Sequence, residues 1–235
     1  MDIPQQITSQ VHDETWAGVT YHIRGELVPE LQLELTDAKV FFEHHTLLWK
    51  QTDVKIEIRK MSGAIKRTIA GGEFFVTRAQ GPGRVAFSRD AAGQMIPLHL
   101  ANGDGVDVRE HQFVAATDNV DFSFERVKGI RNMLFGGTGF FMDKFRAKHG
   151  DAIVWIHGQG NVFVVDLERG EKIDVEPGGW LYKDQHVKME PHTTGLKTGF
   201  FGGGGKFTWQ RFTGPGRVAI QTMYLAPVEA DTTDD

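Results

Sequence analysis

The sequence predicts an all-β protein built from tandem β-units. Along several short segments apolar residues alternate with polar ones, which is typical of half-buried antiparallel strands. No long stretch spaces its apolar residues as an amphipathic helix would, and the 28 glycines provide turns between short strands. Such strands favour a sandwich or barrel architecture. The segments with strict alternation are 31–35, 54–59, 120–125 and 172–176.

Three landmarks recur in the same order, separated by 66 and then by 67 residues. They are a bulky apolar residue, a valine that opens an alternating strand, and a phenylalanine that follows a glycine-rich turn. Their members are Leu47, Phe113 and Trp180; Val54, Val120 and Val187; and Phe74, Phe140 and Phe207. Three landmarks that shift together indicate an internal repeat. We therefore predict β-units at 18–82, 83–149 and 150–226, followed by an acidic tail at 227–235.

One hexapeptide, Gly-Pro-Gly-Arg-Val-Ala, occurs at both 81–86 and 214–219. The middle unit has 148–153 at this place and keeps one glycine, Gly150. Gly-Pro-Gly predicts a type II turn, because proline presets φ at its second position and glycine accepts a positive φ at its third. Each turn leads into an apolar strand, and 20–23 resembles a further copy of that strand.

The composition bounds the class of protein. A net charge of −5 and a pI of about 6.1 weigh against a non-specific nucleic-acid binder, which is usually basic. The absence of cysteine excludes disulfides, a thiolate nucleophile and zinc–thiolate sites, and fits a reducing compartment. The first residues lack the features of a secretory signal, and no apolar run approaches the ~18 residues of a spanning helix. We expect a cytoplasmic protein.

No motif in the sequence points to catalysis. Among the ten histidines there is no His-x-His pair and no His-Glu-x-x-His motif, and no Gly-x-Ser-x-Gly elbow occurs. The neighbours His44 and His45, if they lie in a strand, point to opposite faces and cannot readily share one ion. We therefore predict that the protein is not an enzyme, with no catalytic residue, no metal site and no cofactor.

A connector precedes each landmark phenylalanine, at 63–72, 129–137 and 195–203. Each contains a glycine, an aliphatic residue, a cation, further apolar residues and a glycine pair. Cations beside apolar residues suit an anionic membrane surface or a protein partner, whereas the same composition also suits packing between neighbouring units. The candidate contact residues are Lys66, Arg67, Arg131, Leu134, Phe135, Lys197, Phe200 and Phe201.

The run Met-Leu-Phe-Gly-Gly-Thr-Gly-Phe-Phe at 133–141, together with 212–218, resembles the family named for altered inheritance of mitochondria. The resemblance covers roughly 16–227, and the family is similar in fold to the tryptophan RNA-binding attenuation protein. It implies three such β-units in a pseudo-threefold arrangement, each a short double-stranded β-helix, and a homotrimer that closes a ring of nine units. The first connector departs from the family pattern, because 68–73 replaces the aromatic version.

The resemblance implies no established activity for bacterial and archaeal members, and it links the mitochondrial member to inner-membrane organisation. We predict a non-catalytic, ring-forming β scaffold whose first partner is itself, with an anionic membrane or another protein as a further partner. One alternative is a small-molecule binding protein, which needs a pocket inside a unit or at the ring centre. The other, a nucleic-acid binder, needs a basic groove despite the acidic pI.

The membrane hypothesis predicts that the chain floats with liposomes containing anionic lipid. Reversing the charges at Lys66, Arg131 and Lys197 should abolish flotation, because each cation near such a surface contributes about 1 kcal/mol. Density-gradient flotation measures the bound fraction, and liposomes of neutral lipid are the control. If the unaltered chain and the variant both stay in solution, the connectors do not bind membranes.

Overall fold

The computed structural model describes residues 3–7, 12–58, 68–69, 72–73, 76–127, 140–195 and 206–224. These residues form an all-β fold, as the alternating sequence predicts. Their helical content is one short 3₁₀ turn, η1 (His44–Thr46). The histidine pair therefore lies in a turn rather than in a strand, and the two rings are nearly perpendicular, with centroids 5.3 Å apart.

The strands form four main antiparallel sheets and one two-stranded ribbon. The five-stranded sheet contains, in spatial order, β2 (His12–Trp16), β3 (Val19–Arg24), β4 (Glu30–Leu35), β11 (Gly83–Phe87) and β6 (Leu47–Lys50). The six-stranded sheet contains β12 (Gly93–Leu100), β17 (Ala152–Gln159), β14 (Phe113–Thr117), β5 (Lys39–Glu43), β10 (Val76–Gln80) and β7 (Lys55–Ile58).

The seven- and three-stranded sheets are made mainly from the second half of the chain, and the ribbon comes from the first half. The seven-stranded sheet contains β1 (Gln5–Ile7), β18 (Val162–Leu167), β23 (Gly216–Gln221), β20 (Trp180–Asp184), β13 (Gly105–Arg109), β16 (Phe140–Ala147) and β15 (Val120–Val127). The three-stranded sheet contains β19 (Lys172–Val175), β22 (Lys206–Thr213) and β21 (Lys188–Gly195). The ribbon pairs β8 (Thr68–Ile69) with β9 (Gly72–Glu73).

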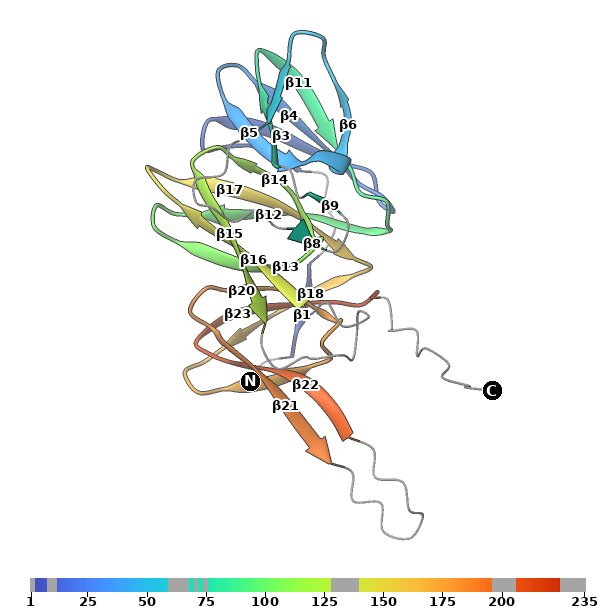
Figure 1. Ribbon diagram of the computed structural model, residues 1–235, viewed down its shortest axis with the longest axis vertical. Helices are drawn as coiled ribbons and strands as arrows, with labels where there is room; N and C mark the ends of the chain where they lie inside the picture. The colour runs from blue at the N-terminus through green and yellow to red at the C-terminus, as the bar shows by residue number, and fades with distance from the viewer. Residues whose placement is uncertain are drawn as a thin grey trace, which may run out of the picture.

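The four main sheets stack along the long axis of the molecule, in the order five-, six-, seven- and three-stranded (Figure 1). A separate apolar core fills each of the three interlayer spaces. Tyr21 and Trp155 meet in the first core, Phe113 and Phe145 in the second, and Trp180 and Phe212 in the third. The two inner sheets therefore bury both faces, and every residue of β14 is buried.

One pattern of pairing occurs three times along the chain. β11 lies between β4 and β6, β17 lies between β12 and β14, and β23 lies between β18 and β20. Likewise β10 lies between β5 and β7, β16 between β13 and β15, and β22 between β19 and β21. The division into attenuation-protein-like units at 18–82, 83–149 and 150–226 stays a prediction.

The segments expected to be strands from their alternation are strands, namely β4, β7, β15 and β19. One of them differs in burial. β7 was expected to be half buried, but all four of its residues are exposed, Ile58 most of all. β7 is one of the two edge strands of the six-stranded sheet, and its alternating residues do not face one of the three cores.

The two Gly-Pro-Gly turns are alike and differ from the expected type II turn. Gly83 and Gly216 adopt positive φ values of 132° and 125°, as the third position requires. The peptide bonds before Pro82 and Pro215 are cis, however, whereas a type II turn has a trans bond there. A Cβ atom at Gly81 would overlap the carbonyl oxygen of Leu35, so close backbone approach requires that first glycine.

The first core predicts the cost of removing its largest side chain. Trp155 is fully buried and packs edge-to-face on Tyr21, with ring centroids 5.5 Å apart. Trp155→Ala should lower the free energy of unfolding by about 3–5 kcal/mol, measured by urea denaturation. Leu27→Ala, at an exposed position, should change it by less than about 0.5 kcal/mol. Equal losses in the two variants would contradict this assignment of the core.

Candidate functional site

The two inner sheets are each assembled from strands that lie far apart in the sequence. In the six-stranded sheet β5 pairs with β14, and in the seven-stranded sheet β13 pairs with β20. Each pairing is antiparallel and joins two of the repeated strand groups. These two pairings are called the internal junctions below.

The strand that corresponds to β14 and β20 at one end of the molecule is β6. All three pair with the middle strand of their group, and all three skip one residue at the same place in a bulge. The skipped residues, Val114 and Leu181, are fully buried, whereas Leu48 of β6 is 57% exposed. Among the described residues β6 pairs with β11 alone, so its other edge is open.

The strand that corresponds to β5 and β13 at the other end is β19. Within the described part of the chain β19 pairs with β22 alone, and its outer edge is open as well. The central residues Phe41 and Asp107 of β5 and β13 are buried, but the equivalent Asp174 is exposed. Figure 1 shows the sheets that contain these two open edges at opposite ends of the stack.

The second internal junction contains a buried ion pair. The ammonium group of Lys183 donates a hydrogen bond of 2.7 Å to Oδ2 of Asp107, and the two side chains are only 5% and 3% exposed. The residues directly opposite each other at the same place in the first junction are Phe41 and Ala116. At this position the second junction therefore pairs opposite charges, whereas the first junction pairs a large apolar residue with a small one.

A cluster of charged groups lies where η1 approaches the turn after β11. The carboxylate of Glu43 is 3.3 Å from the guanidinium of Arg89, and His45 Nε2 is 3.5 Å from that carboxylate. Burial and, secondarily, Arg89 lower the pKa of the nearby His157 to about 4. Burial also lowers the pKa of His45. Both imidazoles are therefore mainly neutral at pH 7, and Glu43 is balanced by Arg89.

A cleft of about 340 Å³ lies beside the second internal junction. Two of its charged groups neutralise each other, because Arg217 binds both carboxylate oxygens of Asp184 at 3.0 and 3.2 Å, and the carboxylate of Asp104 belongs to the same lining. No group of three or more residues suited to hold a metal ion occurs among the described residues. The lining residues are His99, Leu100, Gly103, Asp104, Gly105, Asp184, Gln185, His186 and Arg217.

A family model described as mitochondrial biogenesis AIM24 matches residues 21–223. The chain belongs to this family. The resemblance seen at 133–141 is thereby confirmed, and the description of AIM24 specifies no reaction.

A solved structure supports the AIM24 fold. The protein SPYM3_0169 from Streptococcus pyogenes superposes with a TM-score of 0.65 at 18% identity, over 88% of this chain and 94% of that chain. At that identity the likeness shows the fold alone. The chain matches no curated protein.

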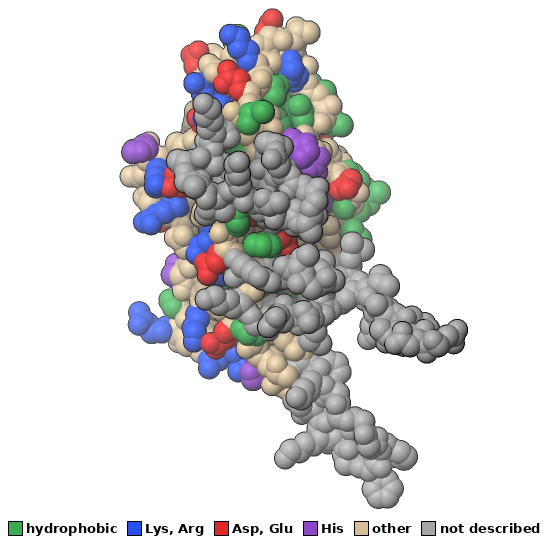
Figure 2. Space-filling view, viewed as in Figure 1, with side chains coloured by type: hydrophobic (Ala, Val, Ile, Leu, Met, Phe, Trp, Pro, Cys, Tyr) green, Lys and Arg blue, Asp and Glu red, His purple; other side chains and the backbone are tan. Residues whose placement is uncertain are grey.

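The contact residues predicted from the AIM24 connectors lie outside the described residues. They are Lys66, Arg67, Arg131, Leu134, Phe135, Lys197, Phe200 and Phe201. In the part of the chain that the structure describes, no helix is long and apolar enough to cross a bilayer. On the face shown in Figure 2, Lys and Arg side chains are interspersed with Asp and Glu rather than gathered in one basic groove.

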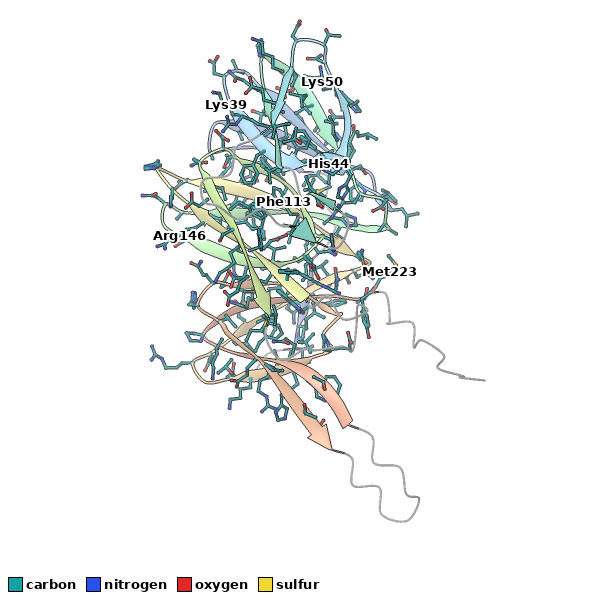
Figure 3. The ribbon with its side chains drawn as sticks, in the orientation of Figure 1. Lys39, His44, Lys50, Phe113, Arg146 and Met223 are labelled. Carbon is teal, nitrogen blue, oxygen red and sulfur yellow. The ribbon has the colours of Figure 1, made fainter. Side chains whose placement is uncertain are left out.

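Sequence reasoning missed the open edges of β6 and β19. The alternation at 172–176 predicts the strand β19. Which strand pairs with it, and which of its edges stays open, depends on residues far away in the sequence. The sequence nevertheless contained a usable signal. In the position of the repeat that Lys183 occupies, the first group also carries a lysine, Lys50, which Figure 3 labels in the outermost sheet.

The lowered pKa of His157 predicts a pH dependence of stability. As pH falls below the ordinary value of 6.5, the unfolded chain binds a proton while the folded imidazole stays neutral down to about pH 4. The unfolding free energy should therefore be highest above pH 6.5 and fall by up to roughly 3 kcal/mol between pH 6.5 and 4.

His157→Gln should remove this part of the slope, as measured by denaturant titrations at several pH values. His186→Gln is the matched control, because His186 is exposed, and it should keep the slope of the unaltered protein. Identical slopes in the two variants would show that His157 is not the group responsible.

Proposed function

We propose that this member of the AIM24 family is a non-catalytic β scaffold that assembles with copies of itself into a ring. The observation that carries the proposal is the pair of open strand edges, β6 and β19, in the sheets at opposite ends of the stack. Inside the chain, strands equivalent to β6 and β19 pair across the internal junctions. An unpaired strand edge presents free N–H and C=O groups, which makes it a template for a further strand.

The exposed side chains on β6 support association. Leu48 and Trp49 are exposed, whereas the side chains at the same positions in β14 and β20 are buried. A strand position that is apolar in all three strand groups and buried in two of them is suited to burial in the third. The two edges differ from each other, so contact between them is head-to-tail, and such contacts form rings when the rotation between neighbours closes.

The arrangement of ionisable groups supports a role without catalysis. Two pairs among the charged groups described above, Arg217–Asp184 and Arg89–Glu43, neutralise each other. The cleft of about 340 Å³ is where the alternative function, small-molecule binding, would be located. Saturable binding there by a discrete small molecule would favour that alternative.

The scaffold proposal predicts a mass in solution that is a multiple of the 26.3 kDa chain, and three copies for a trimeric ring. Light scattering coupled to size-exclusion chromatography at micromolar concentration measures it. Leu48→Asp should shift the protein towards a single chain, because it places a charge in the interface. Leu27→Asp, at another exposed leucine, should leave the mass unchanged. A monomer at all micromolar concentrations would overturn the proposal.

A further inference from the structure

The internal junctions show which residues stand opposite each other when two strand groups join. In both, three consecutive residues of one strand pair with three of the other. The opposed residues are Val40 and Thr117, Phe41 and Ala116, and Phe42 and Ala115 in the first junction, and Val106 and Asp184, Asp107 and Lys183, and Val108 and Tyr182 in the second.

The same register can be transferred to the open edge of β6. Lys50 stands opposite Val85 in the neighbouring strand, as Lys183 stands opposite Val218. In the first junction the equivalent residue is Ala116. Lys50 therefore occupies in β6 the place that Lys183 occupies in β20.

The open edge of β19 is placed by the same comparison. Asp174 stands opposite Arg211 in β22, as Asp107 stands opposite Lys144 in β16. Asp174 therefore occupies in β19 the place of Asp107 in β13. The open edges of β19 and β6 therefore carry an aspartate and a lysine at the positions where Asp107 and Lys183 form the buried ion pair of the second internal junction.

We propose that β19 of one chain pairs antiparallel with β6 of a second copy, with Asp174 directly opposite Lys50. The proposal rests on the self-assembly proposed above and defines its interface. The register then places Val175 opposite Trp49 and Ile173 opposite Gln51. The joined sheet repeats the composite construction of the six- and seven-stranded sheets.

The chemistry of the two side chains fits this pairing. Arg211 hydrogen-bonds both carboxylate oxygens of Asp174, at 2.7 and 2.6 Å, and thereby lowers the pKa of that carboxyl group. The ammonium group of Lys50 is exposed and donates to the backbone carbonyl of Gln51 at 3.2 Å. The carboxylate of Asp174 is thus ionised and bound to Arg211 at one edge, and the ammonium group of Lys50 is exposed at the other. In the proposed pairing Lys50 of the second copy adds a further cation beside Asp174, as Lys183 lies beside Asp107 at the internal junction.

A second copy of this chain is the occupant that the observations favour. The two strands are matched in length, at four residues each, and they carry opposite charges, Lys50 and Asp174, at the middle of the three proposed paired positions. They lie at opposite ends of the stack, so one chain cannot join its own edges (Figure 1). An unrelated peptide would hydrogen-bond with the backbone groups of β6, but nothing would require an acidic residue of that peptide opposite Lys50.

Disulfide cross-linking tests the register, because the chain contains no cysteine. In the variant with Lys50→Cys and Asp174→Cys, oxidation should produce a ladder of covalent oligomers on non-reducing gels. Directly opposed residues on paired antiparallel strands have Cα atoms about 4.5–5.5 Å apart, within the roughly 4.4–6.8 Å that a disulfide spans.

A shifted pair provides the matched control. Lys50→Cys combined with Lys172→Cys uses the same strand and the same face but lies two residues out of register. Diagonal neighbours are about 7–8 Å apart, so this variant should give less than a tenth of the cross-linked product. Equal cross-linking of the two pairs, or none at 50 and 174, would overturn the proposed register.

Charge reversal tests the ion pair without cysteine. Lys50→Asp places two carboxylates opposite each other, which should weaken association by more than tenfold, as measured by light scattering over a dilution series. Lys55→Asp makes the same charge change on the exposed strand β7 and should leave association unchanged. Equal effects of the two variants would overturn the pairing of Lys50 with Asp174.

The outcomes separate the two proposals. If the unaltered chain is a monomer by light scattering, the scaffold proposal fails, and this interface fails with it. If the unaltered chain is oligomeric but neither the cross-link nor Lys50→Asp behaves as expected, self-assembly stands and the β6–β19 register is wrong.

Discussion

Antiparallel pairing across the internal junctions is the constraint on which the rest of the structure depends. Because β5 pairs with β14 and β13 with β20, each inner sheet continues from one strand group into the next. Each inner sheet then faces a core on both sides. Its central strands are therefore buried on both faces, as in β14, whose five residues are all buried, so polar residues there need a partner, as Asp107 and Lys183 have. The layered stack and its three cores follow from those two junctions.

The chemistry at the junctions explains how the register is held. A buried ion pair is weak evidence for stability, since desolvation offsets much of the attraction. It is more informative about position. A slip by one residue would place Lys183 opposite Val106 or Val108 and leave a charge buried without a partner. At the first junction the fit of Phe41 beside Ala116 has the corresponding effect through volume.

The local elements could be predicted from the sequence, and their neighbours could not. The alternation at 31–35 and 120–125 identified strands because side-chain direction in a strand is a local property. Burial of those strands is not local. Ile58 alternates as a core residue would, yet lies on an edge strand and is exposed. The contact residues predicted from the connectors lie outside the described residues, and none of them belongs to the open edges of β6 and β19.

The candidate site shows the same division. The residue types at Lys50 and Asp174 are visible in the sequence. From the sequence alone, however, a single lysine after a tryptophan is interpreted as a solvated surface residue. Their relevance depends on the pair formed by Lys183 and Asp107, which are 76 residues apart. The repeat interval connects the two lysines, and the structure shows what that position does.

The one-sided burial of the outer sheets has a consequence for how firmly the chain is folded along its length. Strands such as β17 are enclosed on both faces and should exchange their amide protons last. β6 and β19 lie in layers with a core on one face alone. Any molecule that binds the native ends stabilises them by mass action. If that molecule is another copy of the chain, the stability of the two outer sheets depends on the concentration of the protein in the cell.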